Sequence, residues 1–224
     1  MRNEYSHRDI RVLKFRFVAT LISVAVMIVT LVPLYMQMYS LDLMELVQMQ
    51  EVADPEQTMA LLLPFFAALG IAGFAGLAAG VFYLMFLYKC WSLIPQGWAR
   101  TTPGKAVGFL FIPFFNLYWM FVAQVGLSVD VNRVLDVCKK EHLKTTTGVA
   151  IGMCVLYLLA SFIGMQPKWA LLINAGLMAV CYTLFFIFAF QAYRASKAVT
   201  EYFVSQFDEP LSRETAFGQG NAGV

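Results

Sequence analysis

Five long apolar stretches constrain the fold of this chain more than any other feature of its sequence. They cover residues 17–38, 60–88, 106–127, 147–165 and 170–193. Each approaches or exceeds the ~20 residues that a helix needs to cross ~30 Å of hydrocarbon. Hydrophobic residues make up 60% of the sequence and charged residues 13%, whereas soluble domains average about 45–50% and about 25%. These features predict an all-α integral membrane protein.

The Lys and Arg residues between the stretches indicate how many of them cross the membrane. If all five cross, the basic residues divide almost equally between the two sides. If 106–127 enters and returns, every one of the 16 Lys and Arg residues except Lys168 falls on one side. Because Lys and Arg collect in the cytoplasmic loops of membrane proteins, four spans are predicted, with both termini in the cytoplasm. The predicted spans are 17–38, 60–88, 147–165 and 170–193.

The third stretch carries its own reason for not crossing. Pro113 interrupts it, and proline removes a helical hydrogen bond and disfavours helical dihedrals at Ile112. Asn116 is expected to cap a new helix that begins just after it. The arm 106–112 before the break reaches only ~10 Å at helical rise. A re-entrant or interfacial hairpin over 106–127 is therefore predicted, and a proline-kinked span through the membrane is the alternative.

Small residues recur every four positions in the second span, at Ala68, Ala72, Gly76 and Gly80. This spacing lets two helix backbones approach closely, which is how membrane helices gain packing contacts. We therefore predict that the stripe packs against another helix, either within the chain or in a second copy of it. The alternative is that the glycines line a pore or mark a hinge.

The chain divides into a basic cytoplasmic N-terminal tail (1–16), one helical membrane domain (17–207) and a C-terminal tail (208–224). The C-terminal tail is polar and contains glycine, so it is predicted to be disordered. Two amphipathic helices are also predicted on the cytoplasmic surface, because apolar residues share one helical face. The first face comprises Leu127, Val131, Val134, Leu135 and Cys138, and the second comprises Val199, Tyr202 and Phe203.

A candidate lipid-headgroup site precedes the third stretch, at Arg100, Thr101, Thr102 and Lys105. Two cationic side chains, two hydroxyls and the exposed amides of a helix start suit a phosphate. At a membrane surface that phosphate belongs to an anionic lipid. The alternative is ordinary interfacial anchoring by basic and aromatic residues.

The sequence offers little for catalysis. The only two histidines are His7 and His142, both outside the apolar stretches, and those stretches contain no Asp, Glu, Lys, Arg or His. Buried ionisable groups carry the chemistry of most intramembrane enzymes and proton-coupled transporters. No zinc or disulfide spacing is present, so the four cysteines are expected to be free thiols packed as small apolar residues. No catalytic residue, metal ion, cofactor or nucleic-acid partner is predicted.

The segment Pro103 to Trp119, which reads PGKAVGFLFIPFFNLYW, resembles a box in uncharacterised bacterial multi-pass membrane proteins. Some of these carry a GYF-like domain ahead of the membrane part, for which this chain has no room. The resemblance covers about 91–130 and implies a protein of the bacterial inner membrane, with no assigned activity. We expect a non-enzymatic interaction, regulatory or scaffold role with lipid or another membrane protein. A small oligomeric channel or transporter is the alternative, and a lipid-acting enzyme is a weaker one.

Overall fold

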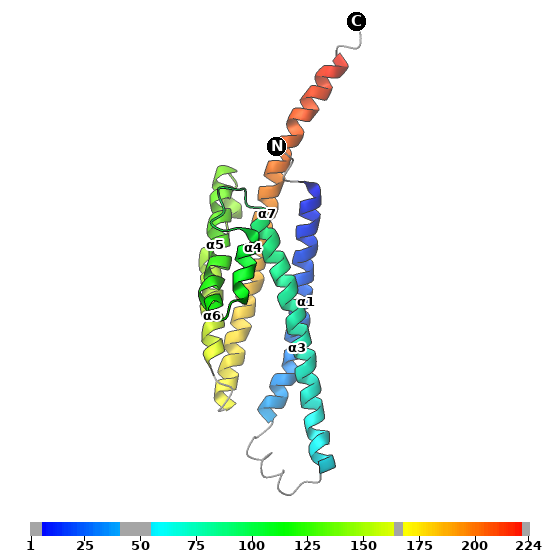
Figure 1. Cartoon of the computed structure of the whole chain (residues 1–224), viewed down its shortest axis with the longest axis vertical. Coiled ribbons are helices and arrows are strands. Elements are labelled where there is room, and N and C mark those ends of the chain that lie inside the picture. Colours follow the sequence, from blue (N-terminus) through cyan, green and yellow to red (C-terminus); the bar gives the residue numbers. More distant parts are fainter. Residues whose placement is uncertain (1–5, 41–54, 164–167, 221–224) are drawn as a thin grey trace.

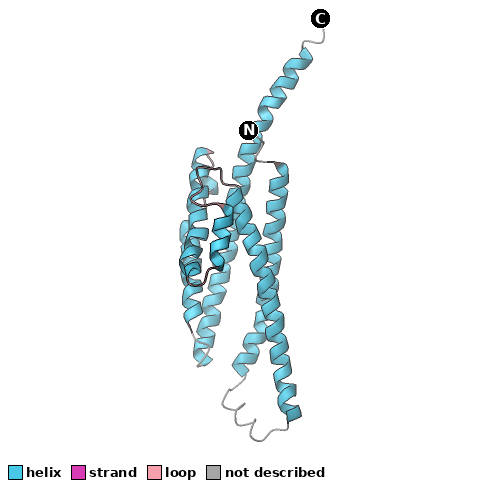
Figure 2. Ribbon diagram, viewed as in Figure 1, coloured by secondary structure: helices cyan, strands magenta, loops and turns pink. Residues whose placement is uncertain are grey.

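The computed structural model describes residues 6–40, 55–163 and 168–220. All regular elements within these ranges are helical (Figure 2). In chain order they are α1 (His7–Ser40), α3 (Pro55–Ser92), α4 (Pro103–Gly108), the 3-10 helix η1 (Phe109–Phe111), α5 (Phe115–Val137), the 3-10 helix η2 (Glu141–Leu143), α6 (Thr147–Phe162) and α7 (Lys168–Gly220). Four of these helices contain segments long and apolar enough to cross a membrane, as predicted. The chain is an all-α membrane protein.

The helices of the four candidate spans, α1, α3, α6 and α7, alternate in direction. Helix α7 lies between an α1–α3 pair and an α5–α6 pair (Figure 1). The start of α1 and the end of α3 lie at the same end of the bundle as the end of α5 and the start of α6. We call this the basic end, because those segments and the loop 93–102 carry most of the described Lys and Arg residues. Lys168, at the start of α7, lies at the opposite end.

The outward faces of the long helices are apolar. Phe74 is 77% exposed, Leu77 is 73% exposed and Val29 is 69% exposed. Side chains of this kind on the outside of a protein mark a surface that meets an apolar environment rather than water. Inside such an environment helices are held together chiefly by close packing and by hydrogen bonds, since lipid tails are as apolar as leucine.

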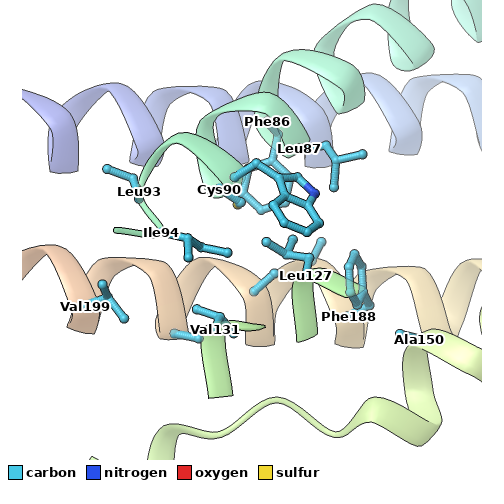
Figure 3. Packing of buried hydrophobic residues seen from close by; sticks show 14 of the residues in the cluster. Phe86, Leu87, Cys90, Leu93, Ile94, Leu127, Val131, Ala150, Phe188 and Val199 are labelled. Atoms are coloured by element: carbon cyan, nitrogen blue, oxygen red, sulfur yellow. The ribbon is translucent and has the colours of Figure 1, made fainter. Parts of the chain in front are cut away.

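A dense core fills the half of the bundle nearest the basic end (Figure 3). Phe86, Leu87 and Cys90 of α3 meet Leu127 of α5 and Phe188 of α7, and all five are at most 1% exposed. Trp91 is equally buried, and its indole Nε1 donates to the carbonyl oxygen of Ala123 at 2.9 Å. These contacts hold α3 against α5 and α7.

Polar contacts join α1 to α3 at the same half. Thr20 donates its hydroxyl to the carbonyl oxygen of Phe82 at 3.0 Å, and Arg16 Nη1 donates to that of Met85 at 3.0 Å. Lys89 Nζ lies 2.6 Å from Asp9 Oδ1. Asp9 also accepts from the Ser6 amide and hydroxyl, which caps the start of α1. Helix α1 therefore begins at His7, inside the predicted basic tail, of which residues 1–5 lie outside the described ranges.

The chain reverses between η1 and α5, so that α4 and α5 form a helical hairpin (Figure 1). Trp119 Nε1 donates to the Ala106 carbonyl oxygen at 3.1 Å, and the Phe109 and Trp119 rings lie 4.8 Å apart between centroids. The turn adopts φ 60° at Phe114, a left-handed value that is costly for a side chain of this size. The helix break predicted at Pro113 is confirmed.

The predicted cap at Asn116 is wrong, because α5 begins earlier than expected. Phe114 occupies the cap position without a side-chain hydrogen bond, and α5 starts at Phe115. The reversal at Pro113 and Phe114 brings the amide of Asn116 to the Ile112 carbonyl oxygen at 3.0 Å. The Asn116 side chain is consequently not used as a cap.

Two further expectations need correction. The apolar face of Leu127, Val131, Val134, Leu135 and Cys138 is at most 6% exposed and packs inside the protein rather than along the membrane surface. Val199 is likewise fully buried. The C-terminal tail predicted to be disordered continues α7 as a helix to Gly220, since extending an existing helix avoids the cost of nucleation. Residues 164–165 of the third span and 221–224 of that tail lie outside the described ranges.

Candidate functional site

A cavity of about 500 Å³ lies between the helices. Its wall takes residues from α1, α3, η1, α5, α6 and α7, so nearly every described element contributes to it. Ligand pockets in proteins typically measure about 300–1,000 Å³ and are mostly apolar with a few placed polar groups. The cavity meets that description and is our candidate functional site.

Packed aromatic side chains close the cavity toward the basic end. Tyr83 of α3 and Phe185 of α7 line it, with ring centroids 5.2 Å apart. About two turns further along, the Phe17 ring of α1 stacks on Tyr193 of α7, with ring centroids 4.5 Å apart. Phe17 also contacts Phe86 of α3, with centroids 5.8 Å apart. The cavity therefore ends at the dense core.

Most of the cavity wall is apolar. Val24 and Met27 come from α1, Leu117 and Met120 from α5, and Met153 from α6. Unbranched methionines adapt their shape to irregular ligands. The described residues that line the cavity include no charged side chain. The wall is thus suited to an uncharged and largely apolar molecule.

Amide and hydroxyl side chains also reach the wall, from Tyr83, Asn116, Gln124, Tyr157 and Tyr182. The Tyr83 hydroxyl is buried and has no hydrogen-bond partner within the described part of the chain. The Gln124 side chain is buried, and its Oε1 accepts from the Cys154 thiol at 3.1 Å, whereas its amide nitrogen has no partner among the described residues. Asn116 lines the cavity as well. Leaving such a group unpaired in a buried site costs about 1–3 kcal/mol, so a ligand that pairs with it gains affinity.

Two other amide side chains within the spans, Asn174 and Gln191, join helices. Asn174 Nδ2 donates to the Ala160 carbonyl oxygen at 2.7 Å, and its Oδ1 accepts from the Tyr35 hydroxyl at 3.0 Å. Gln191 Oε1 accepts from the Thr146 amide at 2.9 Å. These groups are paired within the protein, unlike those on the cavity wall.

The small-residue stripe of α3 has two roles along its length. Ala72 is 4% exposed in the bundle, and a Cβ added at Gly76 would lie 3.8 Å from Met27 Sδ of α1, which agrees with the packing prediction. Gly76 and Gly80 also line the cavity. A Cβ at Gly80 would meet nothing within 4 Å, so a larger side chain there has room to enter the cavity. Ala68 is half-buried and lies outside the wall.

The predicted headgroup site is rearranged by a residue that the sequence did not single out. Asp130 of α5 is fully buried, and Arg100 clamps it through Nε at 3.0 Å and Nη2 at 2.8 Å, with its backbone amide at 2.9 Å. Arg133 Nη1 lies 3.6 Å from the same carboxylate. A Cβ at Gly126 would come within 3.2 Å of Arg100 Cδ, so glycine makes room for the clamp. The Arg100 guanidinium is therefore occupied by a structural ion pair.

The other members of the predicted headgroup site stay at the surface. Thr102 caps α4 by accepting from the Lys105 amide at 3.4 Å, and both side chains are exposed. Thr101 is half-buried. Helix α4 is only six residues long, so its dipole offers little to an anion. One feature of the sequence does indicate this ion pair. Asp130 lies three residues after Leu127, so an acidic side chain interrupts an otherwise apolar helical face.

The four cysteines are free, buried thiols, as the sequence predicted. Cys181 lines the cavity and Cys154 contacts Gln124 beside it. In the described part of the chain, no three His, Cys, Asp or Glu side chains form a group that could hold a metal ion. The cavity's chemistry is thus that of hydroxyl, amide and thiol groups.

No protein-family model, curated protein or solved structure matches this chain. What the protein does is therefore inferred from its own residues and from the cavity that they form.

Proposed function

We propose that this protein is a non-enzymatic membrane protein that binds a lipid-like molecule in the cavity between its helices. The observation that carries this proposal is a cavity of about 500 Å³. Its wall combines apolar side chains with the Tyr83 hydroxyl and the Gln124 amide nitrogen, which have no partner among the described residues. A molecule with a long apolar part and a small polar part fits such a wall. An interaction or regulatory role with lipid follows from it.

A binding role is better supported than a conducting one. Pores that pass ions present rings of carbonyl oxygens or charged side chains to the ion, whereas the described cavity wall is mostly apolar and uncharged. The stacked Phe17 and Tyr193 rings lie between the cavity and the basic end. The channel or transporter hypothesis would require this aromatic layer to open.

The proposed placement in the membrane follows from the charge pattern. With the basic end in the cytoplasm, both termini lie on that side and the α4–α5 hairpin enters and leaves the bilayer through the same face. Backbone broken at Pro113 is tolerated inside a bilayer where protein surrounds it. The resemblance of residues 103–119 to bacterial membrane proteins supports a location in a bacterial inner membrane.

The test of this proposal fills the cavity by replacing one of the glycines that line it. Gly80→Leu places a side chain into the cavity, and Gly73→Leu places the same side chain about two turns earlier on the same helix, at a residue that does not line the cavity. Each variant is purified in nanodiscs made with total bacterial lipid, and tightly retained lipid is measured by mass spectrometry after delipidating washes. We expect about one retained lipid per wild-type and Gly73→Leu protein, and a loss of about tenfold in Gly80→Leu. Equal retention by both variants would reject the proposal.

A further inference from the structure

The unpaired groups on the cavity wall specify the polar part of the ligand. The Gln124 Oε1 already accepts from the Cys154 thiol, which leaves the amide nitrogen, with two N–H donors, as the unused end of that side chain. The Tyr83 hydroxyl is a further donor, for which the described ranges 6–40, 55–163 and 168–220 supply no acceptor. Buried tyrosine hydroxyls usually find one. Asn116, Tyr157 and Tyr182 also line the cavity but are only half-buried or exposed. The two buried donors, on α3 and α5, call for an acceptor on the ligand.

The charge of the surroundings restricts that acceptor. The described residues on the cavity wall carry no charge, and the nearest ion pair on α5, Asp130 with Arg100, lies six residues from Gln124, or ~9 Å along the helix. The two charges of that pair already neutralise each other, so neither is available to a ligand. A phosphate or carboxylate in the cavity would be buried without a counter-ion, which is costly. The acceptor is therefore an uncharged oxygen.

The rest of the wall accommodates an apolar tail. Met27, Met120 and Met153 come from three different helices, and Leu110 and Leu117 come from the two arms of the α4–α5 hairpin. These side chains offer dispersion contacts without specific geometry. A chain of variable length or branching can therefore bind below a fixed polar group.

On these grounds, and resting on the proposed function, we infer that the ligand is a neutral lipid whose carbonyl oxygen accepts hydrogen bonds from Gln124 Nε2 and Tyr83 Oη. Esters of glycerol and prenyl quinones share this chemistry. Gln124 and Tyr83 select for the carbonyl, whereas the glycines and methionines only provide the space. Phosphate-bearing lipids bind in the surrounding bilayer and not in the cavity.

The test separates carbonyl recognition from the mere presence of space. Wild-type protein in nanodiscs of a phospholipid is titrated with four probes of similar length: a diacylglycerol, a dialkylglycerol ether, a prenyl quinone and a saturated hydrocarbon. Retained probe is measured after washing. We expect the diacylglycerol or the quinone to be retained about tenfold better than the ether and the hydrocarbon, as one good hydrogen bond provides. The stronger of the two carbonyl probes identifies the source.

Two variants assign the preference to the named donors. Tyr83→Phe removes only an unpaired hydroxyl, so the protein should fold as well as wild type, and Gln124→Leu removes the amide. Each is expected to reduce the preference for the carbonyl probe to about twofold or less, while hydrocarbon retention is unchanged. Tyr88→Phe, on the exposed side of the same helix, is the matched control and should keep the wild-type preference.

The outcomes distinguish this inference from the proposed function. Suppose that Gly80→Leu abolishes lipid retention, but that wild type retains the carbonyl probes no better than the ether and the hydrocarbon, as Tyr83→Phe does. The proposed lipid binding would then stand, and carbonyl recognition would be refuted. Preferential retention of phosphatidic acid, sensitive to Gly80→Leu, would also refute it. If Gly80→Leu leaves retention unchanged, the proposed function itself fails.

Discussion

The two halves of the bundle are built differently. Near the basic end, the Asp130 carboxylate is clamped by Arg100, and Asn132 Nδ2 donates to the Thr145 carbonyl oxygen at 2.8 Å. In the other half, where the cavity lies, the Tyr83 hydroxyl and the Gln124 amide nitrogen line an open wall and have no partner among the described residues. The Ser128 and Ser196 hydroxyls also have no partner in the described part of the chain, but they are enclosed by packed side chains. What distinguishes the halves is the buried ion pair and dense packing of the one and the open space of the other, so the basic half provides stability and the cavity half leaves room for a ligand.

This division has a physical cause. Buried polar groups lower the stability of a protein when they are unpaired, so a chain retains them where something else compensates. The clamp at Asp130 and the aromatic contacts around Phe17 supply stability that the cavity half can do without. Stability and binding can then be altered separately by substitution.

The largest expected effect tests the packed half. Arg100→Ala leaves the fully buried Asp130 with the backbone amide of residue 100 and the distant contact to Arg133 but without the guanidinium, so we expect a loss of about 3 kcal/mol in the free energy of unfolding. Denaturant titration in mild detergent measures it. Arg100→Ala combined with Asp130→Asn should recover part of the loss, because no charge is left buried. Wild-type stability of the single variant would mean that the clamp is not structural.

A smaller effect is expected where the packed half is held by neutral hydrogen bonds. The Thr145 hydroxyl lies 3.2 Å from the Ser128 carbonyl oxygen and 3.1 Å from Asn132 Oδ1. Thr145→Val removes both contacts and should lower the free energy of unfolding by about 1–2 kcal/mol. Thr183→Val is the control, since Thr183 is bonded only within its own helix, to the Ala179 carbonyl oxygen. Equal losses in the two variants would contradict the comparison.

The smallest effect concerns Cys138, at the end of α5 outside the membrane spans. Burial raises the pKa of the Cys138 thiol, so the reactive thiolate is scarcer at pH 7.5 than for an ordinary cysteine. We expect alkylation several-fold slower than at a cysteine placed by Lys139→Cys, with the gap narrowing as pH rises. Rates are read by mass spectrometry. Equal rates at pH 7.5 would place the apolar face of α5 at the surface after all.

The sequence predicted the features that depend on local composition. Apolar length located the four spans, and Pro113 located the break in the third stretch, because proline acts on its own backbone. The pairing of Arg100 with Asp130 joins residues 30 positions apart, and only helix packing brings them together. The cap at Asn116 was mispredicted because the turn uses a positive φ at Phe114, which nothing in the identity of phenylalanine favours.

The cavity could not have been predicted from the sequence at all. Its lining residues are spread over six elements, and each of them has an ordinary place in an apolar helix. Gly80 illustrates this: its spacing favours packing, yet its open side faces the cavity. Whether a small residue makes a contact or a space depends on the angle between helices.

A cryo-EM map of the protein in native-lipid nanodiscs tests most directly whether the open half is a binding site. We predict elongated density inside the cavity that ends within hydrogen-bonding distance of Tyr83 Oη and Gln124 Nε2. A cavity without such density, with the two polar groups bonded to each other or to the neighbouring helices, would contradict the division of the molecule into a stabilising half and a binding half.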